Sequence, residues 1–286
     1  MRAYLPAYHL ETPPTLAHAL HLLDSEPGRY RPLAGGTDVM VLLEAGQLPV
    51  GRYLNLHGLR ELRGISHDDR YVTMGALTTY TEIRRDPVIT RELPMLVEAA
   101  GHTGAIAIQN RGTIGGNIAN ASPAADSPPA LLAYEAEVEL ASSKGRRWVP
   151  YDRFHLGYKK TAMAADELLT AVRVPRVEER RVHYYRKVGT RRAQAISKVC
   201  IAAVGALQNG VFAGVRIGWG SVAPVPQRSI RVEAVLGGSR PGAEARARAR
   251  VALRSDIAPI DDIRSTRDYR ARVSENLLAD FIAGIS

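Results

Sequence analysis

The 286-residue sequence predicts an α+β protein that is built from two successive units. Over about the first 175 residues, short strand-like and helix-like runs alternate. From about Arg173 onward, several strand-like runs come first and helix-like runs follow, which is typical of a separate α+β unit. Two glycine-rich segments, residues 33–38 and 109–133, lie in the first unit.

In the first unit, apolar spacing and turn residues predict each element. A helix is expected to begin between Thr12 and Thr15, because apolar residues then recur at helical spacing through Leu23. Residues 30–36 predict a short strand that runs into a glycine turn, and residues 128–133 predict a helix. Further strands are expected in "RYLNL" and "RYVTMGAL", and short helices in "TTYTEIRRD" and "PMLVEAAG".

In the second unit, successive strands precede the helices. Asn209-Gly210 lies between two strand-like runs and predicts a tight hairpin. The boundary between the units is expected near Pro175. The strands are expected in "LLTAVRVP", "VHYYRKV", "KVCIAAVGALQ" and "VFAGVRIGWGSV", and the helices in "SIRVEAVL", "AEARARARVAL" and "RDYRARVSENLLADFIAG".

Composition narrows the class of protein. The single cysteine, Cys200, lies among apolar residues, and one thiol forms no intrachain disulfide and holds no iron–sulfur cluster. The charge of +9 could indicate a nucleic-acid partner, but no nucleic-acid motif accompanies it, so we expect none. For the basic stretch from Arg173 to Lys198, a docking face for an acidic partner or for an anionic cofactor is as good an interpretation as a nucleic-acid site. No signal-peptide or membrane-spanning run is present, and we expect a cytoplasmic protein.

The two glycine-rich segments predict a cradle for an anion. Adjacent glycines allow backbone N–H groups to converge on a phosphate, and a helix N-terminus just downstream adds a favourable dipole. The segments match neither the Walker loop nor the GxGxxG fingerprint. The alternative is a pair of glycine turns that merely pack together, but the threonine, serine, asparagine and aspartate around them favour a ligand.

Four stretches carry a family resemblance. "LAGGTD" at 33–38 and "GTIGGNIANASPAAD" at 112–126 resemble the two flavin-binding motifs of the FAD-binding (medium) subunits of molybdenum hydroxylases. That family includes the FAD subunits of xanthine dehydrogenases and the medium subunits of aerobic carbon monoxide dehydrogenases. "FHLGYKKT" at 154–161 and "YRKVGTRRAQAISKV" at 185–199 extend the likeness over nearly the whole chain.

The resemblance implies a fold and a domain division. The fold is that of the vanillyl-alcohol oxidase, or PCMH-type, FAD-binding proteins: two α/β subdomains, then a C-terminal domain of a three-stranded antiparallel sheet and a helical bundle. Residues 1–56 would form the N-terminal FAD-binding subdomain and 57–174 the middle one. Residues 175–286 would form the C-terminal flavoprotein domain.

The resemblance also implies which residues hold one non-covalent FAD. The first motif would present backbone N–H groups to the pyrophosphate, and the second would form the opposite wall of the pyrophosphate and ribityl site. Lys187 lies where the family brings the C-terminal domain near the flavin, but a solvent-facing lysine on a strand is nearly as good a reading. The candidate residues are Leu33, Ala34, Gly35, Gly36, Thr37, Asp38, Thr113, Gly116, Asn117, Ala119, Ser122, Asp126 and Lys187.

The function implied is that of an electron-transfer subunit of an oxidoreductase. A large subunit would carry molybdopterin, a small subunit would carry two 2Fe-2S clusters, and the FAD of this chain would pass electrons to NAD+, quinone or oxygen. A dimer of heterotrimers is expected. Two alternatives stay open: a self-sufficient FAD-dependent reductase of the same fold, as in the enolpyruvyl-glucosamine reductases, and a non-catalytic nucleic-acid-binding protein.

Overall fold

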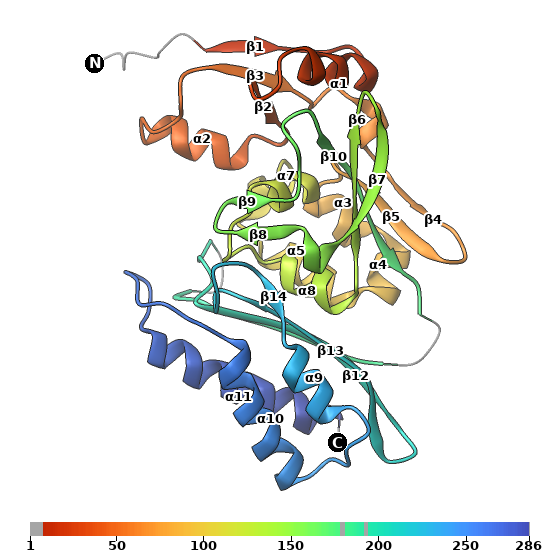
Figure 1. Ribbon diagram of the computed structural model, residues 1–286, viewed down its shortest axis with the longest axis vertical. Coiled ribbons are helices and arrows are strands. Elements are labelled where there is room, and N and C mark those ends of the chain that lie inside the picture. Colours follow the sequence, from red (N-terminus) through yellow and green to blue (C-terminus); the bar gives the residue numbers. More distant parts are fainter. Residues whose placement is uncertain (1–7, 178–180, 192–193, 286) are drawn as a thin grey trace.

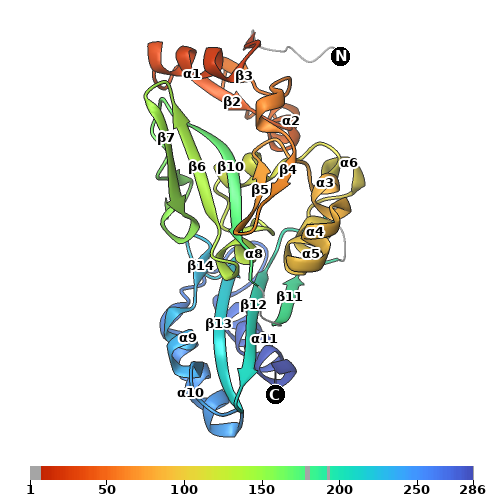
Figure 2. The same ribbon diagram turned by 90° about the vertical axis from the view of Figure 1, so that its right-hand side faces the viewer.

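Three layers, each built on its own β-sheet, are stacked along the long axis of the molecule (Figure 1). The structure, a computed structural model, describes residues 8–177, 181–191 and 194–285. The N-terminal layer lies at one end, the middle layer follows, and the C-terminal layer lies at the other end (Figures 1 and 2). The mixture of helices and strands confirms the α+β class.

The N-terminal layer is a small parallel sheet with two helices. Its strands pair in the order β1-β3-β2. The first helix begins where the sequence predicts, because the Thr15 hydroxyl caps it and accepts a hydrogen bond from the His18 N–H at 3.2 Å. The elements are β1 (His9–Glu11), α1 (Leu16–Ser25), β2 (Tyr30–Leu33), α2 (Thr37–Glu44) and β3 (Arg52–Asn55).

The middle layer is a five-stranded antiparallel sheet, in the order β4-β5-β10-β6-β7. Helices α3, α4, α5 and α6 lie on one side of it (Figure 2). A two-stranded hairpin of β8 (His155–Gly157) and β9 (Lys160–Thr161) accompanies the sheet. The strands are β4 (Ile65–His67), β5 (Tyr71–Gly75), β6 (Glu137–Ser142), β7 (Gly145–Pro150) and β10 (Leu168–Pro175); the helices are η1 (Arg60–Leu62), α3 (Tyr80–Arg85), α4 (Pro87–Glu92), α5 (Pro94–His102), α6 (Ile106–Gln109), α7 (Ile114–Ala119), α8 (Pro128–Ala133) and η2 (Tyr151–Arg153).

The predicted strand "LLTAVRVP" lies in the middle sheet, whereas the sequence grouped it with the strands of the second unit. "LLTAVRVP" forms β10, which pairs with β5 on one side and β6 on the other. It therefore lies in the centre of the middle sheet and is not the first strand of the C-terminal series. Its buried valines, Val172 and Val174, belong to the core of the middle layer.

The C-terminal layer is an antiparallel sheet covered by three helices. β12 and β13 form the predicted hairpin, in which Asn209 and Gly210 both adopt positive φ angles, 53° and 75°. A two-residue strand, β14, adds a fourth strand to the three expected. The elements are β11 (Val182–Val188), β12 (Val199–Gln208), β13 (Val211–Gly220), β14 (Gln227–Arg228), α9 (Ile230–Leu236), α10 (Ala243–Asp256) and α11 (Arg267–Ile285).

Helix α8 joins the middle layer to the C-terminal sheet. All six of its residues are buried. A Cβ atom on Gly218 of β13 would lie 2.2 Å from the carbonyl oxygen of Pro129, so only glycine permits this close approach. Cys200, Ala202 and Val204 of β12 accordingly share a core with the middle layer. Within the described ranges, no helix has both the length and the apolar character needed to cross a lipid bilayer.

Candidate functional site

The first glycine segment connects β2 to α2 and leaves backbone donors free. Gly36 is the N-cap of α2 with a φ angle of 78°, a conformation that favours glycine. No side chain caps the helix. Within the described residues, the N–H groups of Thr37 and Asp38 have no hydrogen-bond acceptor. A Cβ atom on Gly36 would meet nothing closer than Leu33 Cδ1 at 3.8 Å, so the space in front of these donors is open.

The two glycine segments contact each other. A Cβ atom on Gly35 would lie 2.0 Å from the carbonyl oxygen of Arg111, which only glycine avoids. Likewise, a Cβ atom on Gly116 would lie 3.3 Å from Cβ of Ala34. Gly35 thus serves the packing of the two segments, as the alternative reading of the sequence held, whereas Gly36 makes no such contact.

The second glycine segment uses its own backbone donors internally. Thr113 caps α7, and its hydroxyl oxygen accepts a hydrogen bond from the Gly116 N–H at 3.1 Å. The Ile114 N–H donates to the Thr78 carbonyl at 3.0 Å, and the Gly115 N–H donates to the Ala76 carbonyl at 2.9 Å. This segment can therefore bind a ligand mainly through side chains, such as the Thr113 hydroxyl.

Three further predicted residues follow Thr113 on and after α7. Asn117 accepts a hydrogen bond from the Ser127 hydroxyl through Oδ1 at 2.8 Å, which leaves its two amide hydrogens for another partner. Ser122 is partly buried, and its hydroxyl oxygen accepts a hydrogen bond from the Ala124 N–H at 3.3 Å. Ala119 is exposed and offers no side-chain polar group.

Asp126 and Lys187 form a buried ion pair, although they are 61 residues apart. Lys187 Nζ lies 2.7 Å from Asp126 Oδ2 and also donates to the His102 carbonyl at 3.0 Å. The Lys187 side chain is only 5% exposed, so the solvent-facing reading is wrong. Burial raises the pKa of Asp126 to about 6, while the Lys187 ammonium acts in the opposite direction.

The other oxygen of this carboxylate is buried without a partner. Within the described residues, Asp126 Oδ1 has no hydrogen-bond donor, and the buried ring of Tyr80 lies near the carboxylate. The backbone carbonyl of Asp126 accepts a hydrogen bond from the Tyr185 hydroxyl at 3.1 Å. A carboxylate oxygen that lacks a donor suits a ligand that carries hydroxyl groups.

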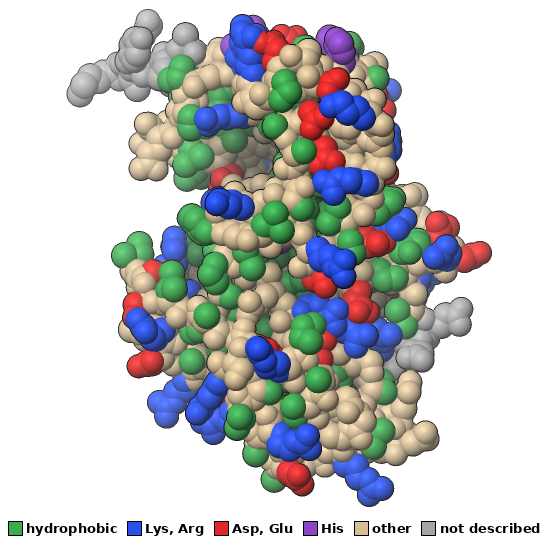
Figure 3. Space-filling model, viewed as in Figure 1, with side chains coloured by type: hydrophobic (Ala, Val, Ile, Leu, Met, Phe, Trp, Pro, Cys, Tyr) green, Lys and Arg blue, Asp and Glu red, His purple; other side chains and the backbone are tan. Residues whose placement is uncertain are grey.

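Lys159 is a residue near this site that the sequence reasoning did not select. Its φ angle is 56°, and its ammonium group donates to the Asn120 carbonyl at 2.7 Å and to Asn120 Oδ1 at 2.8 Å. It thereby fastens the β8–β9 hairpin to the end of α7. The available signal was the pair of lysines in "FHLGYKKT", in a chain with few lysines. The surface is hollowed next to α2, between the N-terminal and middle layers (Figure 3).

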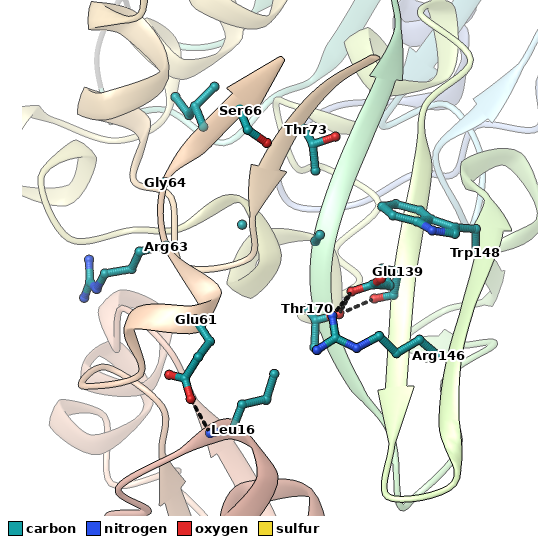
Figure 4. A pocket seen from close by; sticks show the side chains of 13 residues that line it. Leu16, Glu61, Arg63, Gly64, Ser66, Thr73, Glu139, Arg146, Trp148 and Thr170 are labelled. Atoms are coloured by element: carbon teal, nitrogen blue, oxygen red, sulfur yellow. Dashed lines mark hydrogen bonds and ion pairs between the residues drawn. The ribbon is translucent and has the colours of Figure 1, made fainter. Parts of the chain in front are cut away.

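A separate cavity of about 350 Å³ lies on the outer face of the middle sheet (Figure 4). Its polar side chains are largely paired with one another: Glu139 accepts hydrogen bonds from Thr170 and from Arg146. Arg63 points away from the cavity and donates to the His57 carbonyl at 2.8 Å. None of the predicted site residues lines it. The lining residues are Leu16, Glu61, Arg63, Gly64, Ile65, Ser66, Thr73, Gly75, Glu139, Arg146, Trp148, Thr170 and Ala171.

Protein ligands for a metal ion are not gathered in the described part of the chain. No three side chains of histidine, cysteine, aspartate or glutamate lie together there in an arrangement that could hold one. Cys200 is fully buried, and burial raises the pKa of its thiol, so it carries no thiolate near neutral pH.

Comparisons with known proteins agree with this arrangement. Residues 6–177 match the model of the FAD binding domain in molybdopterin dehydrogenase, and residues 183–285 match that of the CO dehydrogenase flavoprotein C-terminal domain. The putative xanthine dehydrogenase FAD-binding subunit of Escherichia coli K12 is 33% identical over 271 residues, covering 94% of this chain and 92% of that protein.

Two further comparisons concern carbon monoxide dehydrogenase of Hydrogenophaga pseudoflava. Its medium chain is 28% identical, covering 96% of this chain and 95% of that protein. A solved structure of that enzyme, lacking the Mo-pyranopterin moiety of its cofactor, superposes with a TM-score of 0.93 over 99% of this chain and 100% of that chain, at 28% identity. This protein therefore belongs to the family of FAD-binding subunits of molybdopterin dehydrogenases, which are components of oxidoreductases.

Proposed function

We propose that the chain holds one non-covalent FAD between the N-terminal and middle layers and transfers electrons between partner subunits and an acceptor. The observation that carries the proposal is the start of α2. There, a positive-φ glycine, free N–H groups and open space in front of Gly36 occur together. These features fit a diphosphate, because N–H donors and the positive end of a helix dipole both favour an anion.

In this proposal the two glycine segments have different tasks. The N–H groups of Gly36, Thr37 and Asp38 bind the diphosphate, with Leu33 and Ala34 setting the path of the chain into the turn. Thr113 and Gly116 shape the opposite wall, because Gly116 leaves room beside Ala34. Lys159, at the edge of that wall, adds a positive charge beside the anion.

The ribityl hydroxyls would be held by side chains of the segment that follows α7. Asn117 has free amide hydrogens, and Asp126 has an oxygen without a donor. Ser122 offers a hydroxyl between them in sequence, and Ala119 contributes only van der Waals contact. Lys187, in the C-terminal sheet, holds the Asp126 carboxylate in place. The proposed flavin site therefore includes one residue of the middle layer and one of the C-terminal layer.

The electron-transfer role follows from what FAD supplies and what the chain lacks. Bound FAD can accept electrons singly and release them as a pair. With one buried cysteine, the chain holds no cluster of its own. We therefore propose that a small subunit with two 2Fe-2S clusters delivers electrons, that a large subunit holds molybdopterin, and that NAD+, quinone or oxygen accepts them. A dimer of such heterotrimers is the proposed assembly.

The same proposal assigns three regions to the chain. We infer an N-terminal FAD-binding subdomain of residues 1–56, a middle subdomain of 57–174 and a C-terminal domain of 175–286. The separate sheets support this division, since each of the three main sheets draws its strands from one of the three ranges, except that the last residue of β10, Pro175, extends the middle sheet one residue past the proposed boundary.

The test is to isolate the tagged chain from its native host without denaturation. We expect about one FAD per chain, released free when the protein is denatured, together with iron, molybdenum and two other polypeptides. A flavin that stays attached to the precipitated chain would contradict non-covalent binding. A metal-free, single-chain species that oxidises NADH at full rate would show a self-sufficient reductase instead.

A further inference from the structure

Asp126 and Glu233 are both deeply buried carboxylates, but the chain satisfies only one of them completely. Their side chains are 10% and 8% exposed. Glu233 Oε1 accepts hydrogen bonds from the Ile217 N–H at 2.9 Å and from Arg228 Nε at 3.1 Å, and Arg228 also donates to Oε2. In Asp126, Oδ2 is paired with Lys187, whereas Oδ1 has no donor among the described residues. Because the oxygens of buried anions are normally hydrogen-bonded, the open Oδ1 indicates a ligand.

Stability of the fold accounts poorly for the Lys187–Asp126 pair. Burying two charges costs hydration energy, and an ion pair recovers this cost only if its remaining hydrogen-bonding groups are satisfied. Oδ1 fails this condition. The middle and C-terminal layers have other contacts: α8 packs on β13 with all its residues buried, and a partly exposed ion pair joins Arg216 to Glu135 at 2.8 Å. A role toward a ligand explains the buried pair better.

Strand β11 holds Asp126 at two points. The Tyr185 hydroxyl donates to the backbone carbonyl of Asp126 at 3.1 Å, and the Lys187 ammonium pairs with the carboxylate at 2.7 Å. The two residues are two positions apart on one strand, so their side chains lie on the same face. Lys187 is itself fixed, because its ammonium also donates to the carbonyl of His102, at the end of α5, at 3.0 Å. Together these contacts determine where Oδ1 points.

Lys187 also controls the charge of Asp126. Among the described residues, three other titratable groups lie around this carboxylate: Tyr80 of α3, Tyr185 of β11 and Cys200 of β12. Burial raises the pKa of all three, so they are uncharged near pH 7. Burial also raises the pKa of Asp126 to about 6, and the Lys187 ammonium opposes that rise. Without the ammonium, the carboxylate would therefore take up a proton at a higher pH.

We propose that Lys187 is a positioning residue for the flavin and that it acts through Asp126. It keeps the carboxylate ionised and orients Oδ1 toward the ribityl hydroxyls, which donate more strongly to an anion than to a protonated acid. Since Lys187 belongs to the C-terminal sheet and Asp126 to the middle layer, the affinity of the site for FAD depends on how these two layers are docked. The inference rests on the proposed function in taking FAD to be the ligand of Asp126.

A double-mutant cycle on the full chain tests this route of action. FAD dissociation constants are measured by flavin fluorescence at pH 7 for the flavin-free wild type, Lys187→Met, Asp126→Asn and the double variant. We expect Lys187→Met to weaken FAD binding about tenfold or more when Asp126 is present, because hydrogen bonds to a charged acceptor are lost. In the Asp126→Asn background the same change should weaken binding less than about threefold, since residues that act through one contact are not additive. Equal losses in both backgrounds would mean that Lys187 contacts FAD directly or acts through the fold at large, and would overturn the proposal.

Arg216→Met is the matched control for Lys187→Met. It also removes one positive charge and breaks an ion pair between the two layers, that with Glu135. In the described part of the chain, Arg216 forms no hydrogen bond or ion pair with a predicted site residue. This variant should bind FAD within about twofold of the wild type, because distant sites act independently. A loss as large as that of Lys187→Met would show that loosening the layers is sufficient, and the specific role of Lys187 would be wrong.

The pH profile is a readout that a purely structural role of Lys187 would not move. In Lys187→Met, the loss of FAD affinity with falling pH should move to higher pH by about one unit or more, because an opposite charge this close to a carboxylate lowers its pKa by at least that amount. The direction follows from the loss of the ammonium, which in the wild type opposes protonation of Asp126. A variant that keeps the wild-type profile would contradict the proposal.

A measurement on the wild-type chain covers the case in which Lys187→Met does not fold. In the isotope-labelled protein, the side-chain ammonium resonance of Lys187 should shift when FAD saturates the site, as the carboxylate paired with it gains hydroxyl donors at Oδ1. A resonance that FAD leaves unchanged would overturn the proposal.

The outcomes separate this inference from the proposed function. If the wild-type chain binds FAD but the losses in the cycle are additive, the proposed function stands and the role of Lys187 fails alone. If the wild-type chain binds no FAD, the proposed function fails, and this inference fails with it.

Discussion

The two glycine segments have similar composition and opposite hydrogen-bonding states. In the first, no side chain caps the start of α2, and the N–H groups of Thr37 and Asp38 are free within the described residues. In the second, the start of α7 is capped by Thr113, and two further N–H groups donate to the Ala76 and Thr78 carbonyls. A glycine-rich helix start is therefore a ligand site only where the surrounding chain leaves its donors unpaired.

The neighbours of each helix explain the difference. Helix α7 packs beside the chain that leaves β5, where a β-bridge joins Thr79 to Thr113, so carbonyl groups are at hand for its donors. Helix α2 projects from the N-terminal layer and has no buried residue (Figure 1). The N-terminus of α2 is consequently accessible, so an anion there can accept hydrogen bonds from the unpaired N–H groups and interact favourably with the helix dipole.

The largest expected effect is that of Gly36→Val in the first segment. Valine resists a φ angle of 78° and projects a branched side chain toward the free donors. Losing two hydrogen bonds to a charged group should weaken FAD binding about 100-fold or more. Retained flavin, measured by absorbance at 450 nm after gel filtration, gives the result.

Gly28→Val is the matched control for this change. Gly28 has the same φ angle, 78°, and no atom within 4 Å of a Cβ, but it lies in the turn before β2. Both variants should lose a similar amount of thermal stability, and only Gly36→Val should lose flavin. Full flavin occupancy in Gly36→Val would show that the first segment is only a turn.

In the second segment, Gly115→Ala should reduce the stability of the fold more than it reduces FAD binding. The new Cβ would lie 2.6 Å from Ala76 Cβ and 2.7 Å from the Ala76 oxygen, so α7 must shift. We expect a loss of about 1–3 kcal/mol in the free energy of unfolding from overpacking. FAD affinity of the folded protein should fall less than in Gly36→Val. Urea unfolding and FAD titration measure the two quantities, and unchanged stability with lost flavin would reverse the assignment of roles.

A smaller effect is expected from acid at Asp126. Because burial raises its pKa to about 6, the carboxylate takes up a proton as the pH falls from 7 to 5 and can no longer accept two hydrogen bonds from hydroxyls. FAD binding should weaken about tenfold over this range. The free energy of unfolding should change oppositely: the folded chain binds this proton before the unfolded chain does, so the contribution of this group to stability rises as the pH falls from about 6 to 4.

Asp126→Asn separates this carboxylate from any other group that takes up a proton over the same pH range. FAD affinity of the variant, measured by quenching of flavin fluorescence, should be lower at pH 7 and nearly constant down to pH 5. A variant with the wild-type pH profile would remove Asp126 from the ribityl site.

Local signals in the sequence predicted much of the fold. The Thr15 cap, the proline-led helix at Pro128–Ala133 and the Asn209-Gly210 hairpin all depend on backbone preferences within a few residues, and all three are confirmed. The glycine turn after the strand at residues 30–36 was predicted for the same reason, and in it Gly36 adopts a φ angle of 78°. The sheet that a strand joins could not be predicted in this way, because strand pairing depends on residues that are distant in the sequence. The sequence of β10 resembles that of the strands after it, but β10 pairs with β5 and β6, nearly 100 and about 30 residues earlier.

The orientation of Lys187 and the pairing of the backbone N–H groups depend on tertiary contacts that local sequence patterns do not reveal. Whether Lys187 points inward is decided by the register of β11 on β12, in which Lys187 is opposite Cys200 on the buried side. The pairing of the Gly115 donor depends on where Ala76 lies, 39 residues earlier. The sequence therefore located the two glycine segments. It could not predict that the backbone N–H groups are unpaired in the first segment and paired in the second.

The most direct test of this difference follows backbone amides while FAD is added to the flavin-free, isotope-labelled chain. We predict that the amide proton resonances of Gly36, Thr37 and Asp38 move downfield on binding, as they acquire a phosphate acceptor. Those of Gly115 and Gly116 should move little, since their acceptors are the chain's own Ala76 carbonyl and Thr113 hydroxyl. Large shifts at Gly115 and Gly116 with unchanged resonances from Gly36 to Asp38 would contradict the account.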